Sequence, residues 1–206
     1  MKVNEFINRL NQLYEYQNTY KLGYFMNKTI DGKYLCDCSG LIKACLWGYP
    51  NGSYASKGLP DINANTMMTS NYSNSHNTNF YHLPTGAIVW INGHIGVHIG
   101  YGVCMESTPK WDNKIQKTYI EGCGYPNAYG LPHSRKWTEW ALLNCIDYSS
   151  NYNPYLQLLN DLKVELRNKL LVCGYTNEQA TQIIKDISKS EDNNGEYYKS
   201  GNCFNY

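Results

Sequence analysis

The sequence predicts an α+β fold in which helices pack on a central antiparallel sheet. Two helical patterns come first, within residues 1–48, and strand patterns separated by turn signals follow within residues 87–107. A chain of 206 residues is long enough to bury a sizeable core, and its length favours one domain with an appendage.

The first helix is predicted near the N-terminus. Apolar residues recur there at steps of three and four, which is the spacing of one helix face. These residues are Val3, Phe6, Ile7, Leu10, Leu13 and Tyr14. Residues 20–36 show no clear periodicity, and Gly23 and Gly32 are read as breaks within them.

A second helix is predicted to begin at Cys38. Asp37 is a suitable N-cap, because its carboxylate can accept hydrogen bonds from the free N–H groups of the first turn. The run from Gly48 to Gly52 ends this helix. Residues 51–82 are rich in Asn, Ser and Thr, and they predict a long surface loop with room for a short helix.

Strands are predicted after this loop. They cover residues 87–91, 94–100, 103–107 and 142–146. Asn92-Gly93 is a hairpin turn signal between the first two strands, and apolar residues alternate with others in the second. Residues 109–136 contain several glycines and prolines and are predicted to be loop.

The chain is predicted to have three regions. Residues 1–148 form the main domain, residues 149–189 a helical hairpin, and residues 190–206 a flexible tail. Thr176 and Gln179 in the hairpin resemble a capping box. A hairpin of this size is too small to be stable alone, so it is interpreted as a targeting module, an oligomerisation element or a brace packed on the main domain.

Charge and composition exclude several classes of function. Lys and Arg number 18 against 17 Asp and Glu, so the chain has a net charge of +1 and no basic footprint for nucleic acid. No apolar stretch is long enough to span a membrane. The N-terminus lacks the apolar core of a signal peptide, so synthesis in the cytoplasm is expected. The eight cysteines are irregularly spaced, which favours free thiols in a reducing compartment.

Cys38, His94 and Glu106 are the candidates for chemistry. A cysteine at a helix N-terminus is expected to have a lowered thiol pKa, because free N–H groups and the helix dipole stabilise the thiolate. A histidine at a strand start can serve as its base. The Tyr101-Gly102 turn is expected to bring Glu106 beside His94, where the carboxylate can accept the second imidazole N–H. Together the three residues point to a cysteine hydrolase.

Each of these residues also has a structural interpretation. Cys38 can be a buried structural cysteine, His94 a hydrogen-bonded turn residue and Glu106 an exposed strand residue. A zinc site would take its ligands from Cys36, Cys38, His94 and His98. Cys-x-Cys is not a usual zinc spacing, so neither a metal nor another cofactor is expected.

Three segments resemble the NlpC/P60 family of cell-wall cysteine peptidases, which have a papain-like fold. They are Asp37-Cys38-Ser39-Gly40-Leu41-Ile42, then Pro84-Thr85-Gly86-Ala87-Ile88-Val89-Trp90, then Gly93-His94-Ile95-Gly96-Val97-His98-Ile99-Gly100. The family has, in this order, a D-C-S-G helix start, a P-G-D-[IL]-V strand and an H-[VI]-G-[IV]-Y-[IL]-G strand. The resemblance covers roughly residues 5–148.

The resemblance implies a role for each matched residue. Cys38 resembles the nucleophile, His94 the base, and Glu106 the third polar residue, where the family mostly has His, Asn or Gln. Tyr24 is the nearest match to a tyrosine that helps to bind the oxyanion, with Ser39 as further support. The residues expected to line the substrate groove are Asp37, Trp111 and His98. Two further departures from the family are Ala87, where Asp is common, and His98, where the family has Tyr.

The implied function is hydrolysis of an amide bond in the stem peptide of peptidoglycan, usually between D-γ-glutamyl and the diamino acid. The alternatives are an N-acetylmuramoyl-L-alanine amidase on the same fold and a non-catalytic wall-binding or tail structural protein. Glu106, the segment 137–140 and the missing signal peptide are similar to phage endolysins of low-GC Gram-positive hosts. Such a lysin would reach the wall through a holin lesion or on a virion. Its expected partner is peptidoglycan, and the C-terminal helices offer a route to self-association.

Overall fold

The computed structural model describes residues 1–50, 58–81, 83–127, 129–149, 166–167 and 169–186. Contacts between Cα atoms divide the chain into two compact units, Met1–Pro154 and Tyr155–Tyr206. The first unit combines helices with a large, mostly antiparallel sheet, so the predicted α+β class is confirmed. The tail predicted at 190–206 lies outside the described residues.

The helices of the first unit follow the predicted patterns. They are α1 (Val3–Glu15), α2 (Cys38–Trp47) and the short α3 (Ala64–Met67). The apolar stripe of α1 is buried, which confirms this helix. As predicted, α2 begins at Cys38 behind Asp37 as its N-cap and ends at Gly48, whose φ of 94° lies in the left-handed region. Every residue of α2 is buried, so this helix lies at the centre of the unit.

A seven-stranded sheet forms most of the remaining unit. In spatial order its strands are β4 (Ser73–Asn77), β10 (Glu139–Leu143), β5 (Ile88–Ile91), β6 (His94–Gly100), β7 (Val103–Thr108), β8 (Lys114–Ile120) and β9 (Ser134–Arg135). Neighbouring strands are antiparallel except β8 and β9, which are parallel. The turn at Asn92-Gly93 places Ile91 opposite His94, which confirms the predicted hairpin.

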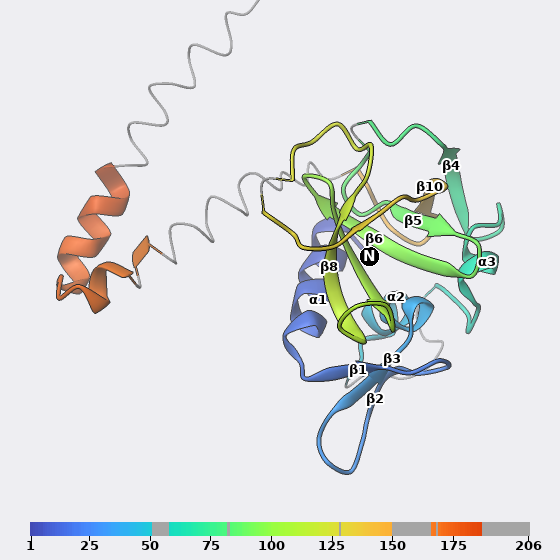
Figure 1. Cartoon of the computed structure of the whole chain (residues 1–206), viewed down its shortest axis with the longest axis horizontal. Helices are drawn as coiled ribbons and strands as arrows, with labels where there is room; N and C mark the ends of the chain where they lie inside the picture. Colours follow the sequence, from blue (N-terminus) through green and yellow to red (C-terminus); the bar gives the residue numbers. More distant parts are fainter. Residues whose placement is uncertain (51–57, 82, 128, 150–165, 168, 187–206) are drawn as a thin grey trace, which may run out of the picture. The chain divides into compact units, whose positions relative to one another are not determined.

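The structure also has a three-stranded sheet that the sequence does not predict. Its order is β1 (Asn18–Tyr20), β3 (Tyr34–Cys36) and β2 (Phe25–Lys28). These strands are short and mostly half-buried, so they show no alternation of apolar and polar residues. β3 runs directly into Asp37 and α2, so the small sheet helps to place the start of that helix (Figure 1).

Three other segments differ from the prediction. Residues 109–136, predicted as loop, contain β8 and β9, and the described part of 51–82 contains β4 as well as α3. The last strand covers Glu139–Leu143 instead of 142–146. The pattern of β8 is hard to recognise because Gln116 and Thr118 are buried, and buried polar residues break the apolar alternation of a strand.

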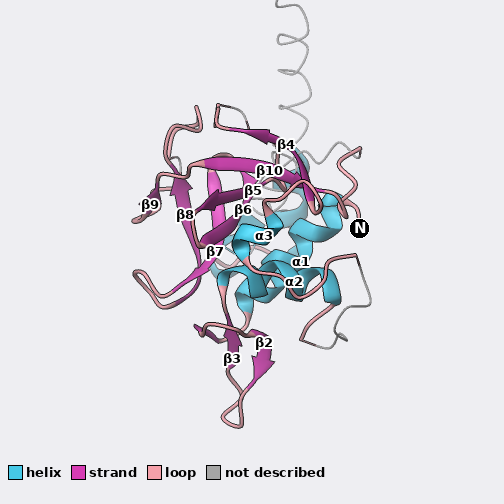
Figure 2. Ribbon diagram, turned by 90° about the vertical axis from the view of Figure 1, so that its right-hand side faces the viewer, coloured by secondary structure: helices cyan, strands magenta, loops and turns pink. Residues whose placement is uncertain are grey.

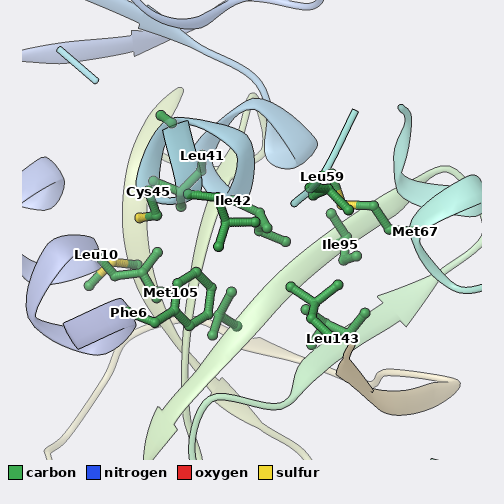
Figure 3. Close-up of a cluster of buried hydrophobic side chains, with 14 of the residues drawn as sticks. Phe6, Leu10, Leu41, Ile42, Cys45, Leu59, Met67, Ile95, Met105 and Leu143 are labelled. Atoms are coloured by element: carbon green, nitrogen blue, oxygen red, sulfur yellow. The ribbon is translucent and has the colours of Figure 1, made fainter. Parts of the chain in front are cut away.

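Both faces of the large sheet are covered. On one face α1 and α2 pack against the strands (Figure 2), and their side chains meet Ile95, Met105 and Leu143 in the main core (Figure 3). A second cluster covers the opposite face, because successive strand residues such as Ile88 and Val89 point to opposite sides. Its buried members are Phe80, Leu83, Ala87, Val89, Cys104, Ile120, Cys123, Trp137 and Trp140.

The second unit is described at residues 166–167 and 169–186. Residues 169–172 and 177–186 are helical. The Thr176 N–H donates to Gln179 Oε1 at 2.8 Å and the Gln179 N–H donates to Thr176 Oγ1 at 3.2 Å, so the predicted capping box is confirmed. In the described parts of the two units, no helix has the length and apolar character of a membrane span.

Candidate active site

Cys38 is held at the start of α2 by the residue that caps it. The Asp37 carboxylate accepts hydrogen bonds from the Gly40 N–H at 2.5 Å and from the Gly23 N–H at 2.7 Å. It also accepts the Ser39 hydroxyl at 3.0 Å. Asp37 is 4% exposed, so it supports the first turn of the helix and does not line the groove, contrary to the expectation from the sequence.

The start of β6 faces this thiol. Helix α2 packs against β6, and the backbone N–H of Ile95, the residue directly after His94, lowers the pKa of the Cys38 thiol. The starts of α2 and β6 therefore meet. Among the described residues no hydrogen bond joins the sulfur to the imidazole of His94, and such catalytic bonds are often long before substrate binds.

The thiol of Cys38 has a raised pKa, which corrects the expectation based on the helix start. Burial raises the pKa of Cys38 most and the charge of Asp37 raises it further, to about 11. The N–H groups of Ile95, Ser39 and Cys38 itself act in the opposite direction and lower this pKa, but burial prevails. A thiol of this kind needs a base close by to become a thiolate at neutral pH.

His94 is oriented by Glu106 on the neighbouring strand β7. His94 Nε2 lies 2.6 Å from Glu106 Oε2, and the two side chains are 14% and 0% exposed. A carboxylate only accepts hydrogen bonds, so Nε2 carries the proton of this bond. Nδ1 is then the ring nitrogen that can exchange a proton with a thiol. The structure thus brings His94 and Glu106 together at the start of β6.

Two residues that the sequence does not single out complete the surroundings of Glu106. Thr118 Oγ1 on β8 donates to Glu106 Oε1 at 2.6 Å. Arg135 on β9 donates from Nε to Oε1 at 3.1 Å, and its Nη2 lies 2.8 Å from Oε2. Burial would raise the pKa of Glu106, but hydrogen bonds from His94, Arg135 and Thr118 outweigh it and lower this pKa below its usual value. Glu106 is therefore a carboxylate at neutral pH.

Aromatic rings hold both His94 and Arg135. The imidazole of His94 stacks on Trp137 with ring centres 5.5 Å apart and planes 12° from parallel. The Arg135 guanidinium lies 5.3 Å from the ring centre of Trp137 and 5.0 Å from that of Trp111. Trp111 stacks in turn on His133 at 4.8 Å. Trp111, predicted as a groove residue, is half-buried and belongs to the aromatic frame around Arg135.

Tyr20, which the sequence does not single out, shares the electrostatic environment of the thiol. Burial raises the pKa of Tyr20, and the charges of Cys38, Asp37 and Cys36 raise it further. Tyr24 contributes its backbone carbonyl, which accepts the Asp37 N–H at 2.8 Å, while its side chain is 37% exposed. The sequence points to Tyr24 and not to Tyr20, because the small sheet that places Tyr20 shows no pattern in the sequence.

His98 lies in the interior and not in the groove, which corrects the expectation that it lines the groove. It is 1% exposed, the Gly102 N–H donates to its Nε2 at 3.2 Å, and its Nδ1 lies 2.9 Å from the Pro84 carbonyl oxygen. These bonds require a neutral ring with its proton on Nδ1. Burial lowers the pKa of His98 to about 4, although the bond to Pro84 acts in the opposite direction.

We expect His98 to make the folding stability depend on pH. Its pKa is about 4 in the folded chain, against an ordinary value of 6.5, so only the unfolded chain binds this proton between the two values. Neutral His98 therefore adds about 3 kcal/mol to the free energy of unfolding above about pH 6.5, and this stabilisation is lost as the pH falls towards 4. The free energy of unfolding, measured in urea between pH 4 and 7, should depend less on pH for His98→Gln than for the native chain. An equal pH dependence in the two chains would contradict this role of His98.

A second chain of hydrogen bonds has the partners of a serine triad but a buried hydroxyl. Ser73 Oγ lies 3.1 Å from His76 Nε2, and His76 Nδ1 lies 2.8 Å from Glu139 Oε1. Ser73 is 1% exposed and also donates to the Thr69 carbonyl at 3.2 Å. A substrate cannot reach this hydroxyl, so we interpret the three side chains as ties between β4 and β10.

The described part of the chain contains no cluster suited to a metal ion. No three or more His, Cys, Asp or Glu side chains converge there in a way that would hold one. The residues considered for zinc were Cys36, Cys38, His94 and His98, and they do not form such a group.

The arrangement of Cys38, His94 and Glu106 can support nucleophilic catalysis by a thiol. No protein-family model matches the chain, and a search of curated proteins finds no relative.

Proposed function

We propose that this chain is a cysteine peptidase that hydrolyses an amide bond in the stem peptide of bacterial peptidoglycan, on a papain-like fold of the NlpC/P60 type. The observation that carries the proposal is the meeting of α2 and β6. The helix that begins at Cys38 packs against the strand that begins at His94, and His94 Nε2 lies 2.6 Å from Glu106 Oε2. The wall substrate comes from the sequence resemblance described above.

In the proposed mechanism, His94 Nδ1 takes the proton of Cys38, and the thiolate attacks the carbonyl carbon of the scissile amide. The tetrahedral intermediate collapses when His94 gives its proton to the leaving amine, which leaves an acyl group on the sulfur. His94 then removes a proton from water, and the hydroxide formed attacks the thioester. The acid product departs, and the thiol is restored with the proton held by His94.

The oxyanion of this mechanism would be bound at the start of α2. The N–H groups of Cys38 and Ser39 belong to the first turn of α2 and lower the pKa of the thiol, so we propose them as the donors to the oxyanion. We propose the Tyr20 hydroxyl as a further donor, because burial raises the pKa of Tyr20 and the charge of Cys38 raises it further, which implies that the two side chains are close. The helix dipole at this position favours the negative charge of the oxyanion.

Clearing of purified Gram-positive cell walls tests the proposal. The native chain should reduce turbidity, Cys38→Ala should not, and Cys173→Ala should behave as the native chain because it alters an exposed cysteine of the second unit. Mass spectrometry of the released fragments would identify the bond and separate a D-γ-glutamyl–diamino acid peptidase from a muramoyl-alanine amidase. Equal clearing by the native chain and Cys38→Ala would rule out the thiol as nucleophile.

A further inference from the structure

The ion pair between Glu106 and Arg135 is buried and has two points of contact. Arg135 Nε donates to Glu106 Oε1 at 3.1 Å, and Arg135 Nη2 lies 2.8 Å from Oε2. The side chains are 0% and 11% exposed, so water does little to screen their charges. The oxygen that meets Nη2 of Arg135 is the same one that lies 2.6 Å from His94 Nε2. The guanidinium therefore competes with the imidazole for the negative charge of one carboxylate oxygen.

The groups that surround Glu106 directly add up to little net charge. Arg135 supplies one positive charge and Glu106 one negative charge. Thr118 is neutral, and burial raises the pKa of Cys104 well above its usual value, so that thiol is neutral as well. On the side of α2 and the small sheet, the groups are Cys38, Asp37 and Tyr20, of which Asp37 carries the charge at neutral pH. The carboxylate of Asp37 accepts hydrogen bonds from the N–H groups of Gly40 and Gly23.

We propose that Arg135 is a positioning residue that neutralises Glu106, so that Glu106 orients His94 as a hydrogen-bond acceptor without adding net negative charge beside the ring. An unpaired carboxylate at 2.6 Å would favour the imidazolium strongly. A general base works best when it can both take and release a proton near the working pH. The guanidinium moderates the carboxylate, and the same ion pair fixes the direction of the carboxylate oxygens.

Arginine suits this role better than lysine would. Its planar fork matches the two carboxylate oxygens, and its faces can stack on aromatic rings. The structure uses both properties, because the guanidinium lies 5.0 Å from the ring centre of Trp111 and 5.3 Å from that of Trp137. Trp137 also stacks on His94, so one ring aligns the guanidinium and the imidazole.

A charge cycle of four chains tests the proposal. The variants are Glu106→Gln, Arg135→Met and the two changes together, each made in the full-length chain with Cys38→Ala so that the thiol does not titrate with the histidine. NMR follows the ring protons of His94 as the pH is changed. Arg135→Met leaves one uncompensated negative charge, so the titration midpoint should rise by about one pH unit or more. Glu106→Gln leaves one positive charge, so the midpoint should fall by a similar amount, and the double variant should return close to the parent.

The outcomes separate this role from a purely structural one. If Arg135 has a structural role only, the single variants should either fail to fold or keep the His94 titration midpoint of the parent. The two single variants would then show no opposite shifts of the midpoint for the double variant to cancel. This result would overturn the proposal. Arg135→Lys provides a check if Arg135→Met fails to fold, because it keeps the positive charge and should keep the midpoint of the parent. The proposal would also be overturned if the His94 midpoint in Arg135→Lys rose as far as the rise expected for Arg135→Met, which lacks the positive charge.

The inference rests on the proposed function only for its effect on the reaction rate. If the chain clears walls, the acidic limb of the pH–rate profile should move to higher pH in Arg135→Met with Cys38 present, in parallel with the NMR midpoint, because neutral His94 is the base. If no variant clears walls while the midpoints shift as described, the proposed function fails and the role of Arg135 in setting the charge at His94 stands. If the native chain clears walls but the midpoints of the variants do not change, the proposed function stands and the role of Arg135 fails.

Discussion

Replacing His94 with glutamine is expected to slow alkylation of Cys38 by iodoacetamide at pH 7 by about 10²- to 10⁴-fold, the usual contribution of a general base. The buried thiol has a pKa of about 11, so only about one molecule in 10⁴ carries a thiolate at pH 7 and the reaction needs a base. In the native chain we expect the imidazole to take this proton as the sulfur reacts. Wall hydrolysis should fall by at least about 10²-fold in the same variant, because the base and the acid of the reaction are both lost.

The pH dependence of alkylation makes this expectation specific. In His94→Gln the rate should rise about tenfold for each pH unit up to the thiol pKa, whereas the native chain should already react at neutral pH. His76→Gln is the matched control, because His76 also pairs with a glutamate, at 2.8 Å, but lies on β4. Rapid alkylation of His94→Gln at pH 7 would mean that the thiol ionises without the imidazole, and it would remove His94 as the base.

Replacing Gly40 with alanine is expected to destabilise the protein by about 3 kcal/mol, the upper end of the usual cost of overpacking. Helix propensity alone predicts the opposite sign, since alanine is favoured over glycine in a helix by about 1 kcal/mol. A Cβ at Gly40 would lie 2.0 Å from the Tyr24 carbonyl oxygen and 3.0 Å from Asp37 Oδ1. The Tyr24 contact involves backbone, so the chain cannot relieve it by rotating a side chain.

Urea unfolding measures this loss, and the rate of Cys38 alkylation reports the geometry of the helix start. Gln12→Ala on the exposed side of α1 is a suitable control, with an expected change within about 0.5 kcal/mol. A gain in stability for Gly40→Ala would show that α2 and the backbone at Tyr24, just before β2, can separate at little cost. The position that holds the nucleophile would then be less rigid than the contacts imply.

The elements that the sequence predicts well are those with a complete local signal. The stripe from Val3 to Leu13 predicts α1, and Asp37 and Gly48 mark the two ends of α2. Asn92-Gly93 predicts the hairpin that places His94 at a strand start. Each signal lies within a few residues of the element it predicts, so the preferences of the backbone suffice to read it.

The elements that the sequence does not predict depend on partners far along the chain. β9 has two residues and exists through its pairing with β8, where Tyr119 lies opposite Ser134 and Ile120 opposite Arg135. β8 itself buries polar residues because one of them, Thr118, donates to Glu106. An apolar pattern cannot indicate a strand whose inward side chains serve a polar site.

The sequence alone determined the α+β class, the helix that begins at Cys38 and the hairpin that carries His94, because these follow from periodicity, capping and turn chemistry. Only the tertiary structure decided the electrostatics of the candidate site. Burial raises the pKa of Cys38 where the helix start predicted a lower one, and Arg135 neutralises the carboxylate that holds His94. Burial and ion pairing depend on which distant segments pack together, and no local pattern in the chain records that information.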